Sequence, residues 1–224
     1  FKADPENRLL SRGSRFRMDS EMVRDQILAT SGLLVDTMFG KSVKPPQPAG
    51  LWKAVSMPSS YPQTYSPDTG DKAYRRSVYT FWKRGMPPPQ MSILNAPGRE
   101  ECTARRERTN TPLQALLLMN ETEYLKAARN LAGHQVLANS TTTNEQKVSA
   151  IYETITSKIP DAKELKVLLD LYSELEKMYL ENPKLADKMC ADLTLTTKES
   201  KAALSAWTMV ASSVYNLDVT KTRE

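Results

Sequence analysis

The sequence has very few of the residues that most often bind metals or act as general bases. Among its 224 residues there are one histidine, His134, and two cysteines, Cys102 and Cys190. One histidine and two distant cysteines do not make the usual ligand set of a zinc site. No CxxCH sequence is present, which excludes covalent attachment of a c-type haem within this chain. We expect neither a metal nor a cofactor in this chain, and we favour two unrelated thiols over a disulfide.

Long apolar runs are also missing. No stretch approaches the ~20 consecutive apolar residues of a membrane-spanning helix. Hydrophobic residues make up 40% and charged residues 25% of the chain, which is ordinary for a soluble globular protein. The chain begins at Phe1 with neither an initiator methionine nor a signal peptide, so we expect a fragment of a longer multidomain protein.

Charge is distributed unevenly along the chain. Residues 1–110 carry 18 Lys and Arg against 11 Asp and Glu, whereas residues 111–224 carry 13 against 15. The basic first half permits an anionic partner, although a solvated basic surface would have the same composition.

The clearest helix start lies where a charged stretch, residues 99–110, passes into an apolar one. Thr111 fits the N-cap, Pro112 the first helical position, and Gln114 completes a capping box. The leucines that follow form an apolar stripe that we expect to face a core. They are Leu113, Leu116 and Leu117. The charged stretch is therefore expected to be held rigidly against packed structure.

Helical periodicity extends over much of the remaining chain. Asp19 is expected to cap a helix whose apolar side faces inward, with Arg24 and Asp25 on the other side. Capping signals predict four later helices, starting at Asn144, at Asp161 with Glu164, at Asn182 and at Thr196 with Glu199. The last of these has an apolar face formed by Leu204, Trp207, Ala211 and Val214.

Residues 42–71 contain six prolines, which leave no room for a regular helix or a central strand. Apolar and aromatic residues in the same stretch indicate a segment that wraps across the helical body rather than a free linker. After it, the β-branched and aromatic residues of Tyr74–Arg84 predict a short strand at Ser77–Trp82, with a helix as the alternative.

These patterns predict a mainly α fold, an antiparallel helical bundle with a proline-rich wrapping segment and at most a short β-hairpin. We expect residues 1–224 to form a single helical domain. Its parts are an N-terminal helical unit at 1–41, the wrapping segment at 42–98 and the bundle at 99–224.

Five arginines form the main candidate site. They come from two segments that we expect to converge, and guanidinium groups bind carboxylate, sulfate or phosphate through paired hydrogen bonds. The alternative is an internal network of ion pairs with Glu100, Glu101 and Glu107. The five are Arg76, Arg84, Arg105, Arg106 and Arg108.

Aromatic residues are concentrated beside these arginines. Seven of the sixteen aromatic residues fall within residues 52–82, and Trp52, Tyr79 and Trp82 join the candidate ligand-binding set. Aromatic faces beside basic groups stack on sugar rings or nucleobases. The alternative is that they hold the proline-rich segment in place. A nucleic acid is the weakest candidate partner because no groove-reading motif is present.

No catalytic residue can be named from the sequence. His134 lies near the expected end of a helix, where a capping role is the simplest interpretation, and nothing in the spacing requires it to meet Cys102. Glu107, between arginines, is expected to be an ion-pair partner rather than an acid for glycoside hydrolysis. Whether the chain is an enzyme stays open.

Several stretches of the sequence resemble one protein family. They are DPENRLLSR, MDSEMVRDQILATSGLL, VKPPQPAGLW, YRRSVYTFWKR, PPPQMSILNAP, CTARRERTNTPLQALLLMN and AWTMVASSVYNLDVTKTRE. These stretches resemble the planctomycete-specific domain of unknown function found at the C-terminal end of large secreted proteins. The resemblance covers essentially the whole chain. In those proteins the domain follows a planctomycete-type cytochrome c domain and a second planctomycete-specific domain.

The resemblance implies an extracytoplasmic location, periplasmic or secreted. It implies upstream cytochrome c and companion domains of the same polypeptide as partners, c-type haem on a separate upstream domain, and a link to polysaccharide use. It assigns no catalytic residue. Where relatives commonly have Asp-Ala-Pro, this chain has Asn95-Ala96-Pro97, which argues against an acid or base at that position.

Two functions follow from these observations. The first is an interaction or scaffold module that docks the upstream domains and binds an anionic ligand, such as an anionic polysaccharide, on the arginine surface. The second is the substrate-binding part of an extracytoplasmic oxidoreductase or carbohydrate-active enzyme.

Overall fold

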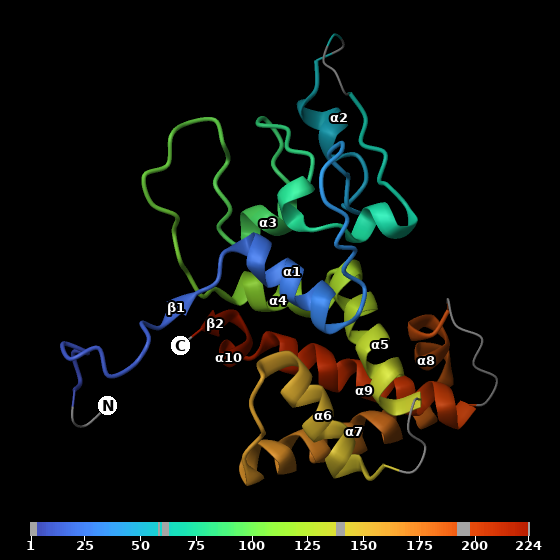
Figure 1. Cartoon of the computed structure of the whole chain (residues 1–224). Coiled ribbons are helices and arrows are strands. Elements are labelled where there is room, and N and C mark those ends of the chain that lie inside the picture. Colours follow the sequence, from blue (N-terminus) through green and yellow to red (C-terminus); the bar gives the residue numbers. More distant parts are fainter. Residues whose placement is uncertain (1–3, 58, 60–62, 138–141, 192–197, 224) are drawn as a thin grey trace.

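A computed structural model describes residues 4–57, 59, 63–137, 142–191 and 198–223. These residues are mainly helical, as predicted, with one two-stranded antiparallel sheet (Figure 1). The helices are α1 (Ser20–Thr30), α2 (Leu51–Val55), α3 (Pro89–Ile93), α4 (Pro112–Asn120), α5 (Thr122–Leu137), α6 (Asn144–Thr156), α7 (Ala162–Glu181), α8 (Pro183–Met189), α9 (Lys198–Asn216) and α10 (Asp218–Lys221). The strands are β1 (Phe16–Arg17) and β2 (Thr222–Arg223), and 3₁₀ turns occur at Gly70–Tyr74 and Ser77–Tyr79.

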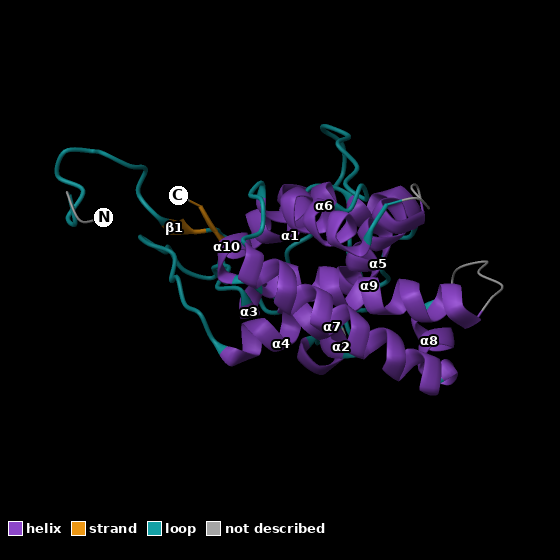
Figure 2. Cartoon of the chain, turned by 90° about the horizontal axis from the view of Figure 1, so that it is seen from below, coloured by secondary structure: helices purple, strands orange, loops and turns teal. Residues whose placement is uncertain are grey.

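Helix α9 lies at the centre of the bundle. It packs against α5 and α7 along its length, with α4, α6 and α8 around it (Figures 1 and 2). Its predicted apolar face is confirmed, because Leu204, Trp207, Ala211 and Val214 are each at most 1% exposed. The ring of Trp207 stacks on Tyr172 of α7 with their centroids 4.0 Å apart. Burial of these large apolar surfaces holds the bundle together.

The predicted helix starts are mostly confirmed. Asp161 accepts hydrogen bonds from two backbone N–H groups of α7, and Glu164 accepts one from the backbone N–H of Asp161, which completes the predicted capping box. Helix α6 is capped by Thr143 rather than by the predicted Asn144. Thr196, the predicted cap of the last helix, lies outside the described residues.

The wrapping segment contains the short helix α2, so the expectation that its prolines leave no room for a helix is wrong for Leu51–Val55, which lies in a stretch without proline between Pro48 and Pro58. In its described residues the segment forms no regular strand, and the strand predicted at Ser77–Trp82 is wrong. Ser77–Tyr79 is a 3₁₀ turn, and the strand-like pairing of this region with residues 35–43 is limited to the isolated bridges Val35–Arg75 and Val43–Thr80. The backbone N–H of Ser77 donates to the carboxylate of Asp25 in α1 at 2.7 Å. In a strand, this backbone N–H would donate to the carbonyl of a neighbouring strand. Here it donates to a side chain of α1 instead.

Strands β1 and β2 join segments from opposite ends of the sequence. Phe16 lies opposite Arg223 and Arg17 opposite Thr222. Because about 200 residues separate the partners, this sheet is not a hairpin. It ties the residues before α1 to those after α10, as Figure 1 shows beside the label of the C-terminus.

A small aromatic cluster holds the wrapping segment in place. Trp52 is 2% exposed, and its ring centroid lies 4.9 Å from that of Tyr65 and 5.7 Å from that of Phe81. The hydroxyl of Tyr65 donates to the carbonyl of Pro45. These contacts agree with the alternative considered for the aromatic residues, which is that they hold the proline-rich segment in place.

Helix α4 is rotated relative to the prediction. Leu113 and Leu116 are 56% and 59% exposed, so the stripe predicted to face a core is wrong for these two, while Leu117 is partly buried. The buried positions are Gln114 and Leu118, each 1% exposed. The reason is that the Gln114 side chain makes hydrogen bonds inside the protein, and this sets the face that α4 turns inward.

Cys102 is exposed, Cys190 is buried and both are free thiols, as favoured. None of the described helices combines the length and the apolar character needed to cross a membrane. Within the same residues, no group of three or more His, Cys, Asp and Glu side chains is placed to hold a metal ion.

Candidate anion-binding surface

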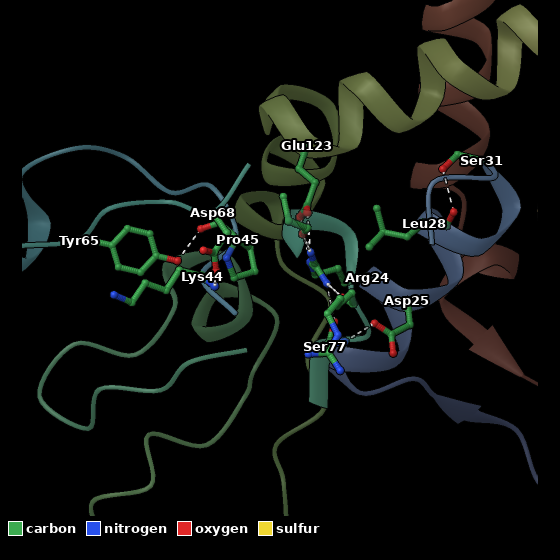
Figure 3. A network of polar contacts seen from close by, with 12 residues as sticks. Arg24, Asp25, Leu28, Ser31, Lys44, Pro45, Tyr65, Asp68, Ser77 and Glu123 are labelled. Atoms are coloured by element: carbon green, nitrogen blue, oxygen red, sulfur yellow. Dashed lines mark hydrogen bonds and ion pairs between the residues drawn. The ribbon is translucent and has the colours of Figure 1, made fainter. Parts of the chain in front are cut away.

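Arg24 of α1 is fully buried and uses every donor of its guanidinium group (Figure 3). Nε and Nη2 donate to the two carboxylate oxygens of Glu123 in α5, at 2.9 and 2.6 Å. Nη1 donates to the carbonyl of Arg75 at 3.0 Å and to the hydroxyl of Ser77 at 3.2 Å, and Nη2 also donates to the carbonyl of Ala73 at 2.9 Å. A guanidinium has five N–H donors, so none is left unsatisfied.

This network joins α1, α5 and the wrapping segment. Burial opposes the charged form of Arg24, but the paired carboxylate of Glu123 outweighs it, so the pKa of Arg24 is raised. The sequence placed Arg24 on the side of α1 away from the apolar positions, but it did not predict that this side is buried as well. No local pattern marks this residue, because its partners lie about 50 and 100 residues away.

Arg75 joins the wrapping segment to residues 37–41. Its guanidinium donates to the carbonyls of Thr37, Phe39 and Lys41 at 2.7, 2.6 and 3.0 Å. It also lies over the ring of Tyr79, 3.9 Å from the centroid. Tyr79, a candidate ligand residue, is therefore occupied in supporting Arg75.

The charged stretch forms a long loop between α3 and α4, here called loop 95–111, that projects from the body (Figure 1). A cluster of side chains closes its two ends. Gln114 Nε2 donates to the carbonyl of Ile93 at 3.0 Å, to Oδ1 of Asn95 at 2.5 Å and to the hydroxyl of Thr109 at 3.1 Å. The Thr109 hydroxyl donates to Asn95 Oδ1 at 2.8 Å. The base of the loop is thus held against packed structure.

The same cluster corrects the predicted capping box of α4. The Thr111 hydroxyl does accept a hydrogen bond from the backbone N–H of Gln114. The Gln114 side chain, however, turns inward to the loop base and does not cap the helix. Asn95 has a left-handed backbone with φ of 66°, which Asn and Asp tolerate better than most residues. Its role here is that of an acceptor, which an aspartate would also supply.

Arg106 attaches the loop to the start of α1. Its two terminal nitrogens donate to the carboxylate of Glu21 at 2.7 and 3.1 Å, and one lies 3.5 Å from Asp19. Burial raises the pKa of Glu21, but the hydrogen bonds from Arg106 outweigh it, so the pKa of Glu21 is lowered. The charge of Arg106, a candidate ligand residue, is therefore already neutralised by Glu21.

Arg105 and Arg108 are exposed on the same loop. Among the described residues no carboxylate pairs with either, and Arg108 lies over the ring of Phe16, 5.8 Å from the centroid. They line a shallow hollow of about 470 Å³, here called the loop hollow, formed by Arg105, Arg106, Glu107, Arg108 and Thr109. The structure therefore leaves part of the predicted arginine set available to a ligand.

The two arginines of the wrapping segment lie apart from this hollow. Arg76 approaches Asp25 of α1 at 3.9 Å, one helical turn beyond the Glu21 that holds Arg106. Arg84 is exposed and does not line the loop hollow. The ion pairs of the described residues thus join Arg76 and Arg106 to α1, and not to the acidic residues considered in the alternative, Glu100, Glu101 and Glu107.

The two tryptophans of the candidate set have structural contacts. Trp52 is buried in the aromatic cluster. Trp82 is partly exposed, donates from its indole nitrogen to the carbonyl of Gly98 at 3.1 Å, and lies under the guanidinium of Arg99 at 4.2 Å. Neither lines the loop hollow. His134 is exposed in the last turn of α5.

Fold and surface together define a mainly helical domain with a wrapped segment and a partly neutralised arginine surface. The chain belongs to the family PSD1, described as a protein of unknown function (DUF1553), with residues 1–172 matched. The match ends within α7, so the central helix α9 and the C-terminal stretch quoted above lie beyond it. Comparisons with curated proteins and with solved structures gave no match.

Proposed function

We propose that this domain is an interaction module that binds an anionic ligand at the loop hollow. One observation carries the proposal: Arg105 and Arg108 line a hollow on a loop whose base is clamped, and neither has a carboxylate partner among the described residues. Arg106 next to them is held by Glu21, so it fixes the loop and leaves its neighbours available.

The chemistry of the hollow favours sulfate or carboxylate groups. Guanidinium groups bind such anions through two parallel hydrogen bonds, and binding is less costly when the cations are already held in place. The hollow is open, so a polymer that displays charged groups along its length can reach the arginines. Glu107 is the one carboxylate among its lining residues. An anionic polysaccharide is the ligand that we propose.

The proposed setting comes from the family resemblance. We place the domain at the C-terminal end of an exported planctomycete protein, downstream of a c-type cytochrome domain and a companion domain to which it docks. The haem would belong to the upstream domain. The alternative function is the substrate-binding part of an extracytoplasmic oxidoreductase or carbohydrate-active enzyme, for which glycoside hydrolysis would need two carboxylates across the hollow.

The test is titration calorimetry of the chain with heparin and with polygalacturonate. We expect binding by the wild type and a loss of about tenfold in the Arg105→Ala, Arg108→Ala variant, as for two partly exposed cations. The control is Lys166→Ala, Lys177→Ala, which removes the same charge from exposed positions on α7. Equal weakening in both variants, or no binding by the wild type, would contradict the proposal.

A further inference from the structure

A second hollow lies where β1 and β2 meet the turn between α6 and α7. It measures about 360 Å³ and is here called the terminal hollow. Three cations and three hydroxyl groups are among its lining residues, which are Arg15, Thr156, Ser157, Lys158, Val219, Thr222 and Arg223. The Thr156 hydroxyl donates to the carbonyl of Tyr152, and the Thr222 hydroxyl donates to Asp218. The Ser157 hydroxyl and the cationic groups are the donors that would bind an oxyanion such as sulfate or carboxylate.

The charges around the terminal hollow are not balanced by described carboxylates. Asp218 forms an ion pair with Arg15 and lies 3.6 Å from Arg17. No ion pair to a described carboxylate involves Lys158 or Arg223. Two of the three lining cations are therefore available to an anion.

The electrostatics of the neighbouring buried cations agree with this surplus. Burial lowers the pKa of Lys221, the charge of Arg17 lowers it further, and Asp218 opposes both effects. Burial likewise lowers the pKa of Arg17 against the pull of Asp218. The repulsion between Arg17 and Lys221 adds to the burial of Lys221, and a nearby anion would oppose both effects.

A single aromatic ring links the two hollows. Arg108 of the loop hollow lies over Phe16, and Phe16 stands opposite Arg223 of the terminal hollow in the β1–β2 pair. The side chains of directly opposed residues on antiparallel strands point to the same face, and their Cα atoms lie about 5 Å apart. The two cationic hollows are therefore neighbours across Phe16, which is 38% exposed.

We propose that the loop hollow, Phe16 and the terminal hollow form one continuous track for an extended polyanion, an anionic polysaccharide chain. This inference rests on the proposed function and specifies its ligand as a polymer that spans both hollows. The phenyl ring between the cations suits the C–H face of a sugar while acidic groups reach the cations on either side. A single-stranded nucleic acid would need several stacking rings, and the track offers one.

The experiment compares a heparin disaccharide with a long heparin fragment by calorimetry. We expect the long fragment to bind on the order of 100-fold more tightly, because it engages both hollows at once. Lys158→Ala, Arg223→Ala and Arg105→Ala, Arg108→Ala should each weaken binding of the long fragment about tenfold. Lys166→Ala, Lys177→Ala should leave it within about twofold.

The variants also separate this inference from the proposed function. If Arg105→Ala, Arg108→Ala weakens binding but Lys158→Ala, Arg223→Ala does not, the track is wrong and the single loop hollow remains. If neither pair matters, or no heparin binds, both proposals fail. Polyglutamate binding as tightly as heparin would overturn the assignment of the ligand to polysaccharide.

A folding control is needed because Arg223 lies in β2. Thermal denaturation of each variant should match that of the wild type. The variant Arg223→Lys keeps the positive charge and leaves Lys158 unchanged. It should bind the long heparin fragment nearly as tightly as the wild type. Loss of binding in that variant with an unchanged melting temperature would show that the charge of the terminal hollow is not what matters.

Discussion

Arg24 illustrates how one residue can link parts of the chain that lie far apart. Removing a charged pair from water costs several kcal/mol per ion, and only close partners with further hydrogen bonds repay it. Here Glu123 supplies both oxygens, and the carbonyls and hydroxyl of the wrapping segment take the remaining donors. The pair therefore tolerates full burial, and it depends on all three segments being in place.

We predict that Arg24→Met lowers the free energy of unfolding by about 3–5 kcal/mol, because it leaves the buried carboxylate of Glu123 unpaired. Urea denaturation would measure the loss. Arg76→Met is the control, since its pair with Asp25 is long, at 3.9 Å, and exposed, and it should cost less than about 1 kcal/mol. Arg24→Met with Glu123→Leu should recover much of the loss. A single variant as stable as the control would refute this account.

The sequence predicted that α1 is a helix with an apolar side, and this is confirmed by the burial of Val23 and Ile27. It could not predict that the opposite side is covered as well. Helical periodicity reports which residues share a face, but the cover over Arg24 and Asp25 comes from residues 73–77. Which segment lies over a face is a long-range property.

At the scale of elements, loop 95–111 depends on contacts at its base and on one ion pair to α1. Gln114, Asn95 and Thr109 close the base, and Arg106 reaches Glu21. The sequence predicted a loop held against packed structure, but it assigned the holding to exposed leucines of α4. A buried glutamine carries out that task because the two N–H donors of its amide are shared among a carbonyl and two side-chain oxygens at the loop base, and its own oxygen accepts from Arg17.

The pH dependence of stability tests the contact between the loop and α1. The pKa of Glu21 is lowered in the folded protein, so its ion pair stabilises the fold above the ordinary pKa of 4.5. This stability is lost as the pH falls through the lowered value. Urea denaturation from neutral pH to about pH 3 should therefore show a shallower loss for Glu21→Gln than for the wild type.

The matched control for that series is Glu153→Gln, the same change at an exposed position of α6. It should keep the acid dependence of the wild type. If Glu21→Gln keeps it too, the ion pair with Arg106 does not fix the loop, and the clamped surface proposed above loses one of its two supports.

At the scale of the whole molecule, the described residues contain two apolar centres. One is the bundle around Trp207, and the other is the aromatic cluster around Trp52. The Arg24–Glu123 pair joins α1 and α5 of the bundle to residues 73–77 of the wrapping segment. The expected division at residues 1–41, 42–98 and 99–224 stays a prediction.

We predict that these centres fail separately. Trp207→Ala should lower the free energy of unfolding of the whole protein by about 3–5 kcal/mol, because it leaves a large cavity in the bundle. Trp52→Ala should instead release the wrapping segment and speed hydrogen exchange at the amides of Val43 and Phe81, which are protected by backbone hydrogen bonds. Amides of α9 should keep their protection in Trp52→Ala. Equal loss of protection in α9 would mean that the molecule opens as one unit.

The sequence by itself determined the longer helices of the bundle, the capping box of α7 and the buried face of α9, because these depend on neighbours within a few residues. Only the tertiary structure decided that Arg24 and Gln114 are buried, that Leu116 is exposed, and that Phe16 connects Arg108 to Arg223. Each of these depends on which distant segments meet. Local periodicity carries no information about that pairing, since the same helix or turn is compatible with many partners.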